Sequence, residues 1–165
     1  EKIIKSLKSN KGIYLVPAFT GLGAPYWAVN ARGVLSGLTR DTGPKEIVRA
    51  TVESVAYQTH DLFEAMNNDG LKPRIIKVDG GMVKNNWFSQ FLSDVVNIKV
   101  LRPKVDETTA LGAAFMAGLQ IGVYKSLKDI SKNWKADRIF NPKMKIQHRK
   151  NLIKGWKSVI KKTLL

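Results

Sequence analysis

The sequence contains no cysteine and only two histidines, His60 and His148. Without cysteine, the chain can form no disulfide framework, no thiolate nucleophile and no cysteine-containing zinc or iron–sulfur centre. With only two histidines, we also expect no histidine metal cluster. The composition therefore assigns no metal ligand to this chain.

Long apolar runs are also missing. The opening stretch, EKIIKSLKSNKG, lacks the run of about seven apolar residues found in signal peptides, and no run approaches the roughly 18 residues that span a bilayer. We therefore expect a cytoplasmic protein without a membrane span. At 165 residues, with 44% hydrophobic and 25% charged residues, the chain has the composition of a water-soluble domain with a sizeable core.

Acidic residues are scarce: 13 of them face 28 lysines and arginines, which gives a net charge of +15. Much of this positive excess lies at the two ends of the chain. Residues 1–11 hold four lysines and one glutamate, and residues 138–165 hold nine basic residues and no acidic one. Such a charge permits a nucleic-acid-binding module. Lysines outnumber arginines 21 to 7, and no aromatic residues interleave the terminal lysines, which favours a solvated lysine-rich surface without nucleic acid as a partner.

Short runs rich in branched and aromatic residues alternate with longer segments of helical periodicity. Strands are expected over residues 12–19, 34–38, 74–78 and 97–101, and helices over residues 44–67, 85–96 and 143–164. A further helix, capped by Asp106 or Thr108, should run to about Ile121. The alternation predicts an α/β fold with parallel strand pairing, and residues 133–142 are expected to be a linker.

Two of these helices carry informative patterns. In the helix over residues 44–67, which Gly43 and Pro44 should start, apolar side chains recur at three- and four-residue steps and predict a stripe that faces the core: Val48, Val52, Val55, Thr59, Leu62 and Met66. His60 in its later turns is expected to be a surface or packing residue. The segment TTALGAAFMAG is rich in alanine and glycine, which predicts that its helix packs tightly against a sheet or another helix.

The turn Asp79–Gly80–Gly81 joins an expected strand to an expected helix and is the best local candidate for ligand contact. Glycines let the backbone approach a ligand closely, and the amides of a helix start attract anions. Asn85, one turn further on, should project onto the same end, where its amide suits a ribose or an adenine edge. A tight turn that merely needs glycine explains the same pattern, so both interpretations stay open.

Recognisable catalytic motifs are absent. The sequence has no phosphate-binding loop with its lysine, no nucleophile elbow, no dinucleotide fingerprint and no obvious pair of carboxylates. The glycine-rich loop over residues 20–33 is either a packed surface loop or a loop near a ligand. We therefore expect binding elements but no catalytic residue.

Several long segments together resemble a known family. They follow one another in the family's order: VPAFTGLGAPYW (residues 16–27), ARGVLSGLTR (31–40), RATVESVAYQTHDLFEAM (49–66), VDGGMVKNN (78–86) and ETTALGAAFMAGL (107–119). These segments resemble the C-terminal half of the glycerol kinases, members of the FGGY family of carbohydrate kinases. The family signature is also met, by Gly33, Leu35, Gly37 and Leu38 and, after a seven-residue gap, by Glu46, Ile47, Ala50, Thr51, Val52 and Glu53.

The resemblance implies an actin-like, ribonuclease-H-like fold, in which two domains close over ATP and glycerol and transfer the γ-phosphoryl group to give glycerol 3-phosphate. It implies a basic N-terminal segment over residues 1–11 and a nucleotide-contacting C-terminal domain over residues 12–165, with its first strands missing. It also implies that Gly81 and Asn85, with Gly80 beside them, contact ATP or ADP. Ala28 departs from the family, which usually has an aspartate there.

In that family the catalytic base, the glycerol contacts and the groups that hold phosphate and Mg²⁺ precede the point where this chain begins. We therefore expect neither catalytic residues nor Mg²⁺ ligands here, and no activity from these 165 residues alone. Exposed strand edges and apolar faces should be covered by the missing part or by another copy in a homo-oligomer.

Three other functions remain open from the sequence. Relatives within the family phosphorylate ketopentoses or gluconate, although the GLGAPYW loop favours glycerol. A basic nucleic-acid-binding module would use the terminal lysines. An interaction module would dock an acidic partner on the last helix.

Overall fold

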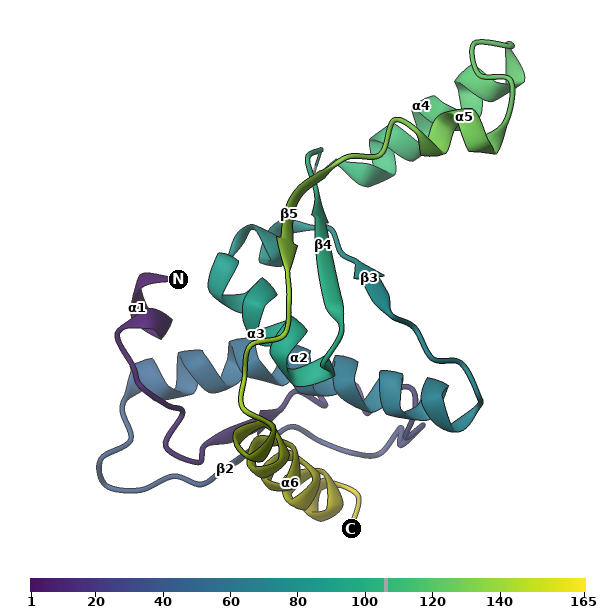
Figure 1. The fold of residues 1–165 in the computed structure, drawn as a ribbon. Coiled ribbons are helices and arrows are strands. Elements are labelled where there is room, and N and C mark those ends of the chain that lie inside the picture. Colours follow the sequence, from purple (N-terminus) through teal and green to yellow (C-terminus); the bar gives the residue numbers. More distant parts are fainter. Residues whose placement is uncertain (106) are drawn as a thin grey trace.

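The computed structural model describes residues 1–105 and 107–165 as a mixed α/β structure (Figure 1). The elements are, in chain order, α1 (Lys2–Lys5), β1 (Tyr14–Val16), β2 (Val34–Ser36), α2 (Pro44–Asn68), β3 (Ile75–Lys77), the 3-10 helix η1 (Gly81–Lys84), α3 (Asn86–Val96), β4 (Lys99–Pro103), α4 (Thr108–Gln120), α5 (Leu127–Ser131), β5 (Ala136–Phe140) and α6 (Ile146–Thr163). No helix among these residues is long and apolar enough to cross a bilayer.

Two small sheets frame the molecule. β1 pairs with β2 in an antiparallel hairpin, whereas β3, β4 and β5 form a second sheet in that order. The parallel pairing expected from the alternating pattern is confirmed for β3 and β4 only, because β5 runs antiparallel to β4. The prediction of a linker over residues 133–142 is therefore wrong. The middle of this segment is β5, which an ion pair of 2.5 Å between Arg102 and Asp137 links to β4.

The core lies where α2, α3 and α6 meet the β1–β2 hairpin. Tyr57 on α2 stacks on Trp156 of α6, with ring centroids 5.3 Å apart, and meets Phe91 of α3 edge-on at 5.7 Å. Tyr14 of β1 approaches the same ring at 5.6 Å. Since Tyr57 and Trp156 are both almost fully buried, this aromatic cluster holds four elements together.

The prediction of a buried apolar stripe on α2 is wrong at two positions. Val48 and Leu62 are 41% and 42% exposed, whereas the buried face of α2 carries Glu53, Tyr57 and Asp61. Glu53 is satisfied there because it accepts hydrogen bonds from Asn10 at 2.8 Å, Arg49 at 2.7 Å and Tyr57 at 3.1 Å. The helix is thus buried through a polar network and an aromatic ring as well as through its branched side chains.

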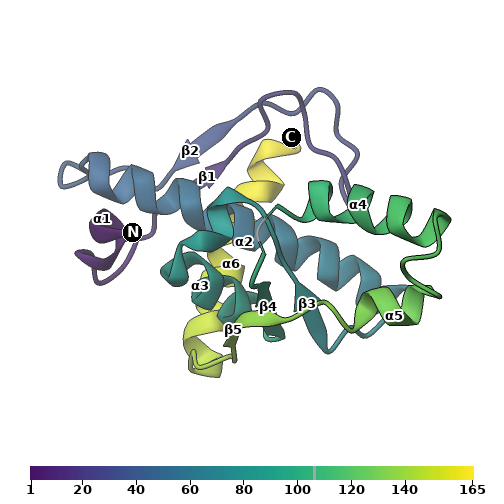
Figure 2. The ribbon, with the colours of Figure 1, turned by 90° about the horizontal axis from the view of Figure 1, so that it is seen from above.

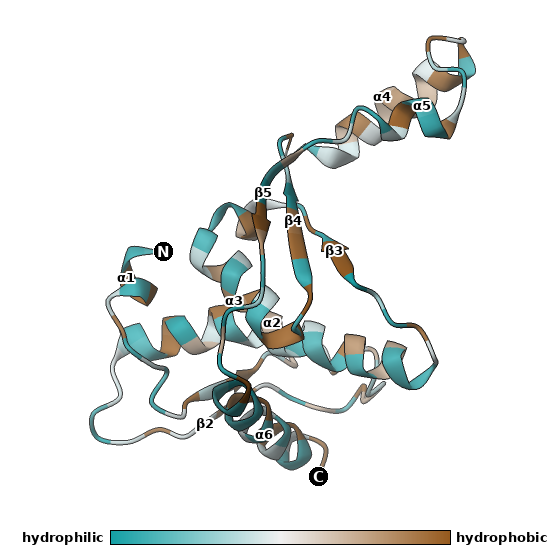
Figure 3. Ribbon diagram, viewed as in Figure 1, coloured by the Kyte–Doolittle hydropathy of each residue, from teal (hydrophilic) through white to brown (hydrophobic). Residues whose placement is uncertain are grey.

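α4 and α5 project away from the rest of the chain (Figures 1 and 2). Only Gly118 of α4 is buried, and a Cβ added at Gly112 would meet no atom of the described residues within 4 Å. The tight packing expected from the small residues is therefore wrong for the part of the chain described here. Much of α4 and of β3 is apolar (Figure 3). The expected cap Asp106 lies outside the described residues, and Thr108 is the first residue of α4.

The start of α2 supports a pH prediction. Glu46 lies 2.9 Å from the Lys11 ammonium and accepts the Gly43 backbone N–H at 3.1 Å. The Lys11 ammonium, together with the backbone N–H groups of Glu46 and Gly43, holds the pKa of the Glu46 carboxyl below its ordinary value. Folding therefore favours the ionised carboxylate, and its stabilisation is present above about pH 4.5 and lost as the pH falls through the lowered pKa.

We expect Glu46→Gln to lower the free energy of unfolding at neutral pH and to approach the wild type at acidic pH. Urea unfolding of both proteins across pH 3–7 would measure this, and a difference that stays constant with pH would contradict it.

Candidate functional site

The sequence-predicted turn lies in the open. Asp79, Gly80 and Gly81 follow β3 and lead through η1 into α3, and both glycines are exposed. Gly80 has a φ of 89°, a conformation that favours glycine. A Cβ added at Gly80 or Gly81 would meet no atom of the described residues within 4 Å. Packing thus does not require glycine at Gly81, and the space beside both residues is free for a ligand.

A pocket of about 330 Å³ opens beside this turn. Asp79, Gly80, Gly81 and Lys84 form one wall, and residues 107–109 at the start of α4 form the other. The Thr108 hydroxyl donates a hydrogen bond to Asp79, which connects the two walls. The pocket therefore combines open backbone, carboxylates, hydroxyls and one lysine.

The second wall of the pocket was not predicted from the sequence. Glu107, Thr108 and Thr109 were not assigned to a site, yet they face the glycine turn. The signal was the expected parallel pairing, because the carboxyl ends of adjacent parallel strands meet at one edge of a sheet. The loops that follow β3 and β4 must therefore lie side by side.

Asn85 has a different position from the glycines. Its side-chain oxygen accepts hydrogen bonds from the backbone N–H groups of Trp87 at 3.0 Å and Phe88 at 3.2 Å, and so caps α3. It is half-buried and is not among the residues that line the pocket. Only the NH₂ group of its amide could meet a ligand, so a nucleotide contact by Asn85 stays a prediction.

Arg102 on β4 holds the segment that follows the glycines. Its guanidinium donates to the backbone oxygens of Val83 at 3.0 Å and Lys84 at 3.3 Å, and to the Asn86 side chain at 3.0 Å. On its other side it pairs with Asp137 of β5. One side chain thus fixes η1 and the start of α3 to the sheet, a role that nothing in the local sequence indicated.

This contact generates a stability prediction with a matched control. Arg102→Ala should cost about 1–3 kcal/mol of unfolding free energy, because Val83, Lys84, Asn86 and Asp137 would all lose the donor that they share. Arg138→Ala is the control, since both guanidiniums lie over the Phe140 ring, at 5.7 Å for Arg102 and 5.4 Å for Arg138.

Chemical denaturation would give the stabilities, and amide hydrogen exchange over residues 81–86 should accelerate in Arg102→Ala only. Equal effects in the two variants would mean that the ring contact, rather than the tie to η1, is what Arg102 contributes.

Comparisons with known proteins show the family of this chain. The model of the FGGY family of carbohydrate kinases, C-terminal domain, matches residues 3–121. The chain is 52% identical over 160 residues to a glycerol kinase of Alteromonas mediterranea, covering 97% of this chain and 32% of that protein. It is 56% identical over 152 residues to a glycerol kinase of Ectopseudomonas mendocina, covering 92% of this chain and 31% of that protein.

Solved structures give the same result. A Plasmodium falciparum glycerol kinase with ADP matches with a TM-score of 0.87 and 35% identity over 99% of this chain and 33% of that one. A ligand-bound xylulose kinase from Lactobacillus acidophilus matches with a TM-score of 0.78 and 25% identity over 96% of this chain and 34% of that one. These matches confirm the expected α/β, actin-like fold. The chain spans about a third of the length of these relatives.

Proposed function

Because this chain belongs to the FGGY family of carbohydrate kinases, we propose that it forms the nucleotide-contacting wall of an enzyme that transfers the γ-phosphoryl group of ATP to glycerol. The product would be glycerol 3-phosphate. The observation that carries the proposal is the open pocket at Gly80 and Gly81, at the carboxyl ends of two parallel strands. Ligands of open α/β sheets bind at such an edge.

The residues at the pocket suit one part of a nucleotide. Gly80 and Gly81 let a flat or charged group approach the backbone, and the hydroxyls of Thr108 and Thr109 can donate or accept hydrogen bonds. We assign the contact with ATP or ADP to Gly80 and Gly81, and to the amide NH₂ group of Asn85. The chemistry of transfer itself requires in-line positioning and charge neutralisation of the phosphoryl group.

Mg²⁺ would accompany ATP, and the pocket offers few carboxylate ligands for this ion. Its carboxylates are Asp79 and Glu107, and Asp79 already accepts the Thr108 hydroxyl. We therefore place the Mg²⁺ ligands, the catalytic base and the glycerol contacts in the remaining two-thirds of a full-length enzyme that acts in the cytoplasm.

Glycerol is favoured over other substrates of the family by the degree of similarity. Among the solved structures, the glycerol kinase is 35% identical to this chain, whereas a xylulose kinase and a gluconate kinase are each 25% identical. A ketopentose or gluconate kinase remains the alternative.

The exposed apolar surface fits a chain that works as part of a larger body. Met116, Ile121 and Val123 on or just after α4 are 53%, 75% and 65% exposed, and Ile75 on the edge strand β3 is 52% exposed. We propose that the rest of the enzyme covers this surface, with a second copy in a homo-oligomer as the alternative.

A pair of glycine variants tests the nucleotide site. Gly81→Val should weaken ADP binding at least tenfold because its side chain would fill the pocket, while the stability changes by only about 0.5 kcal/mol. Gly23→Val is the matched control, since Gly23 is also exposed with open space at its Cβ position. Calorimetric titration with ADP would measure both. An equal ADP affinity in the two variants would remove Gly81 from the site.

The same titration, followed by NMR, separates the kinase from a nucleic-acid-binding module. ADP should shift the amide signals of Gly80, Gly81 and Asn85, and a short oligonucleotide should not. Shifts confined to the lysines of residues 143–165, with an affinity that falls steeply as salt rises, would favour nucleic acid instead.

The 165 residues alone should produce no glycerol 3-phosphate from ATP and glycerol, because their pocket offers one side of a nucleotide site and the family resemblance places the catalytic base outside them. A coupled assay for ADP release would measure this. Glycerol-dependent turnover by the purified chain would refute the proposed division of labour.

A further inference from the structure

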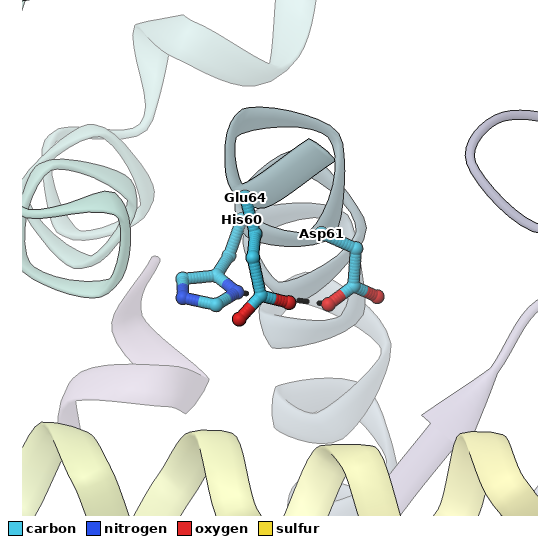
Figure 4. A group of neighbouring side chains, drawn as sticks. All are labelled: His60, Asp61 and Glu64. Atoms are coloured by element: carbon cyan, nitrogen blue, oxygen red, sulfur yellow. Dashed lines mark ion pairs between the residues drawn. The ribbon is translucent and has the colours of Figure 1, made fainter. Parts of the chain in front are cut away.

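The second half of α2 gathers three side chains that no part of the proposed kinase site uses. His60, Asp61 and Glu64 each offer one ligand atom, and these atoms lie within 4.8 Å of one another. Figure 4 shows the imidazole and the two carboxylates converging on one side of the helix. The carboxylates follow the histidine by one and by four residues, so a single helix supplies the whole group.

Two atoms of this cluster are buried without a hydrogen bond. Asp61 is 2% exposed, and one carboxylate oxygen, Oδ2, accepts the Trp156 indole N–H at 2.6 Å. The other, Oδ1, and the His60 Nδ1 atom are both buried and make no hydrogen bond of ordinary length among the described residues, and the Tyr26 hydroxyl is the one further donor that lies close to the Asp61 carboxylate. They lie 3.6 Å apart, which is too long for a hydrogen bond.

Buried polar atoms without partners are rare, because each one costs about 1–3 kcal/mol of desolvation. Here a ring nitrogen and a carboxylate oxygen face each other, and both can donate an electron pair. A cation between them would satisfy both atoms at once. The spacing fits, because a tetrahedral zinc ion with bonds of about 2.1 Å holds its ligand atoms roughly 3.4 Å apart.

The third ligand already binds a positive charge. The Lys157 ammonium of α6 lies 2.5 Å and 2.6 Å from the two oxygens of Glu64. Both side chains are nearly half exposed, at 44% for Lys157 and 45% for Glu64, so this pair contributes little to stability and can open. His60 and Glu64 also border a pocket of about 540 Å³, so an ion can approach these two residues from solvent, whereas Asp61 does not line the pocket.

We propose that His60 Nδ1, Asp61 Oδ1 and the Glu64 carboxylate bind one Zn²⁺ ion, with Lys157 as the competing cation. One imidazole and two carboxylates form a ligand set that zinc accepts, with water in the fourth position. The basic side chains Arg149, Lys150 and Lys154 border the same pocket and oppose a cation, so the affinity should be modest. The site is independent of the proposed kinase function.

Zn²⁺ titrated alone into the 165-residue chain, followed by calorimetry, tests this site. His60→Ala and Glu64→Gln should each weaken binding about tenfold or more, as loss of a ligand does. His148→Ala is the matched control, since His148 is the other histidine of the chain and is exposed on α6. The Zn²⁺ affinity of His148→Ala should stay within about twofold of the wild type. This change is smaller than the tenfold loss expected when a true ligand is removed.

Lys157→Met distinguishes Zn²⁺ binding at this site from non-specific binding elsewhere on the surface. Removing the competing ammonium should strengthen Zn²⁺ binding several-fold, whereas a site elsewhere would not respond. Glu64 is nearly half exposed, so Glu64→Gln should fold normally and keeps the test valid if His60→Ala does not. Circular dichroism in the presence of a chelator checks the fold of each variant.

Three results would overturn the proposal. They are an absence of Zn²⁺ binding, an affinity unchanged by Glu64→Gln, and equal losses in His60→Ala and His148→Ala, which would indicate adventitious binding to histidine. In the outcome that supports it, Zn²⁺ also raises the thermal midpoint of the wild type and of His148→Ala by clearly more than that of Glu64→Gln.

Discussion

The pocket depends on the parallel pairing of β3 with β4. Ile75 lies opposite Lys99 and Lys77 opposite Leu101, so both strands end at the same edge of the sheet. This register brings the turn at residues 79–81 beside the start of α4, although more than twenty residues separate them in the chain. Arg102, at the end of β4, then reaches η1 and fixes it. An antiparallel pairing of β3 and β4 would place the two walls of the pocket at opposite edges.

Local sequence was informative where local forces decide the structure. The start of α2 at Pro44, the strand before the glycine turn and the helix that ends at Val96 follow from capping residues and periodicity. β5 was missed because three of its five residues, ADRIF, are exposed and two are charged, and only pairing with β4 makes them a strand. The buried face of α2 was misjudged for a related reason, since Glu53 is buried by partners that are far away in the sequence, such as Asn10.

The small residues of α4 form a pattern typical of close helix packing, but the described residues provide no closely packed neighbour at Gly112. Its small residues predict the close approach of another backbone, yet among residues 1–105 and 107–165 nothing packs closely against Gly112. The helix has no charged residue, and most of its length is exposed, which is costly for a surface that stays in water. This mismatch fits the proposal that the partner of α4 belongs to the other two-thirds of the enzyme.

The cluster on α2 shows the opposite limit of sequence reasoning. Counting histidines argued against a metal site, because composition treats ligands as separate residues that the fold must bring together. A helix removes part of that cost, because residues four positions apart, such as His60 and Glu64, lie on the same face of the helix. Whether such a set can bind an ion then depends on burial, and here Trp156 holds one oxygen of Asp61 while the other makes no hydrogen bond of ordinary length in the described structure. Only the packing of α6 against α2 creates that condition, so no count of residues could have indicated it.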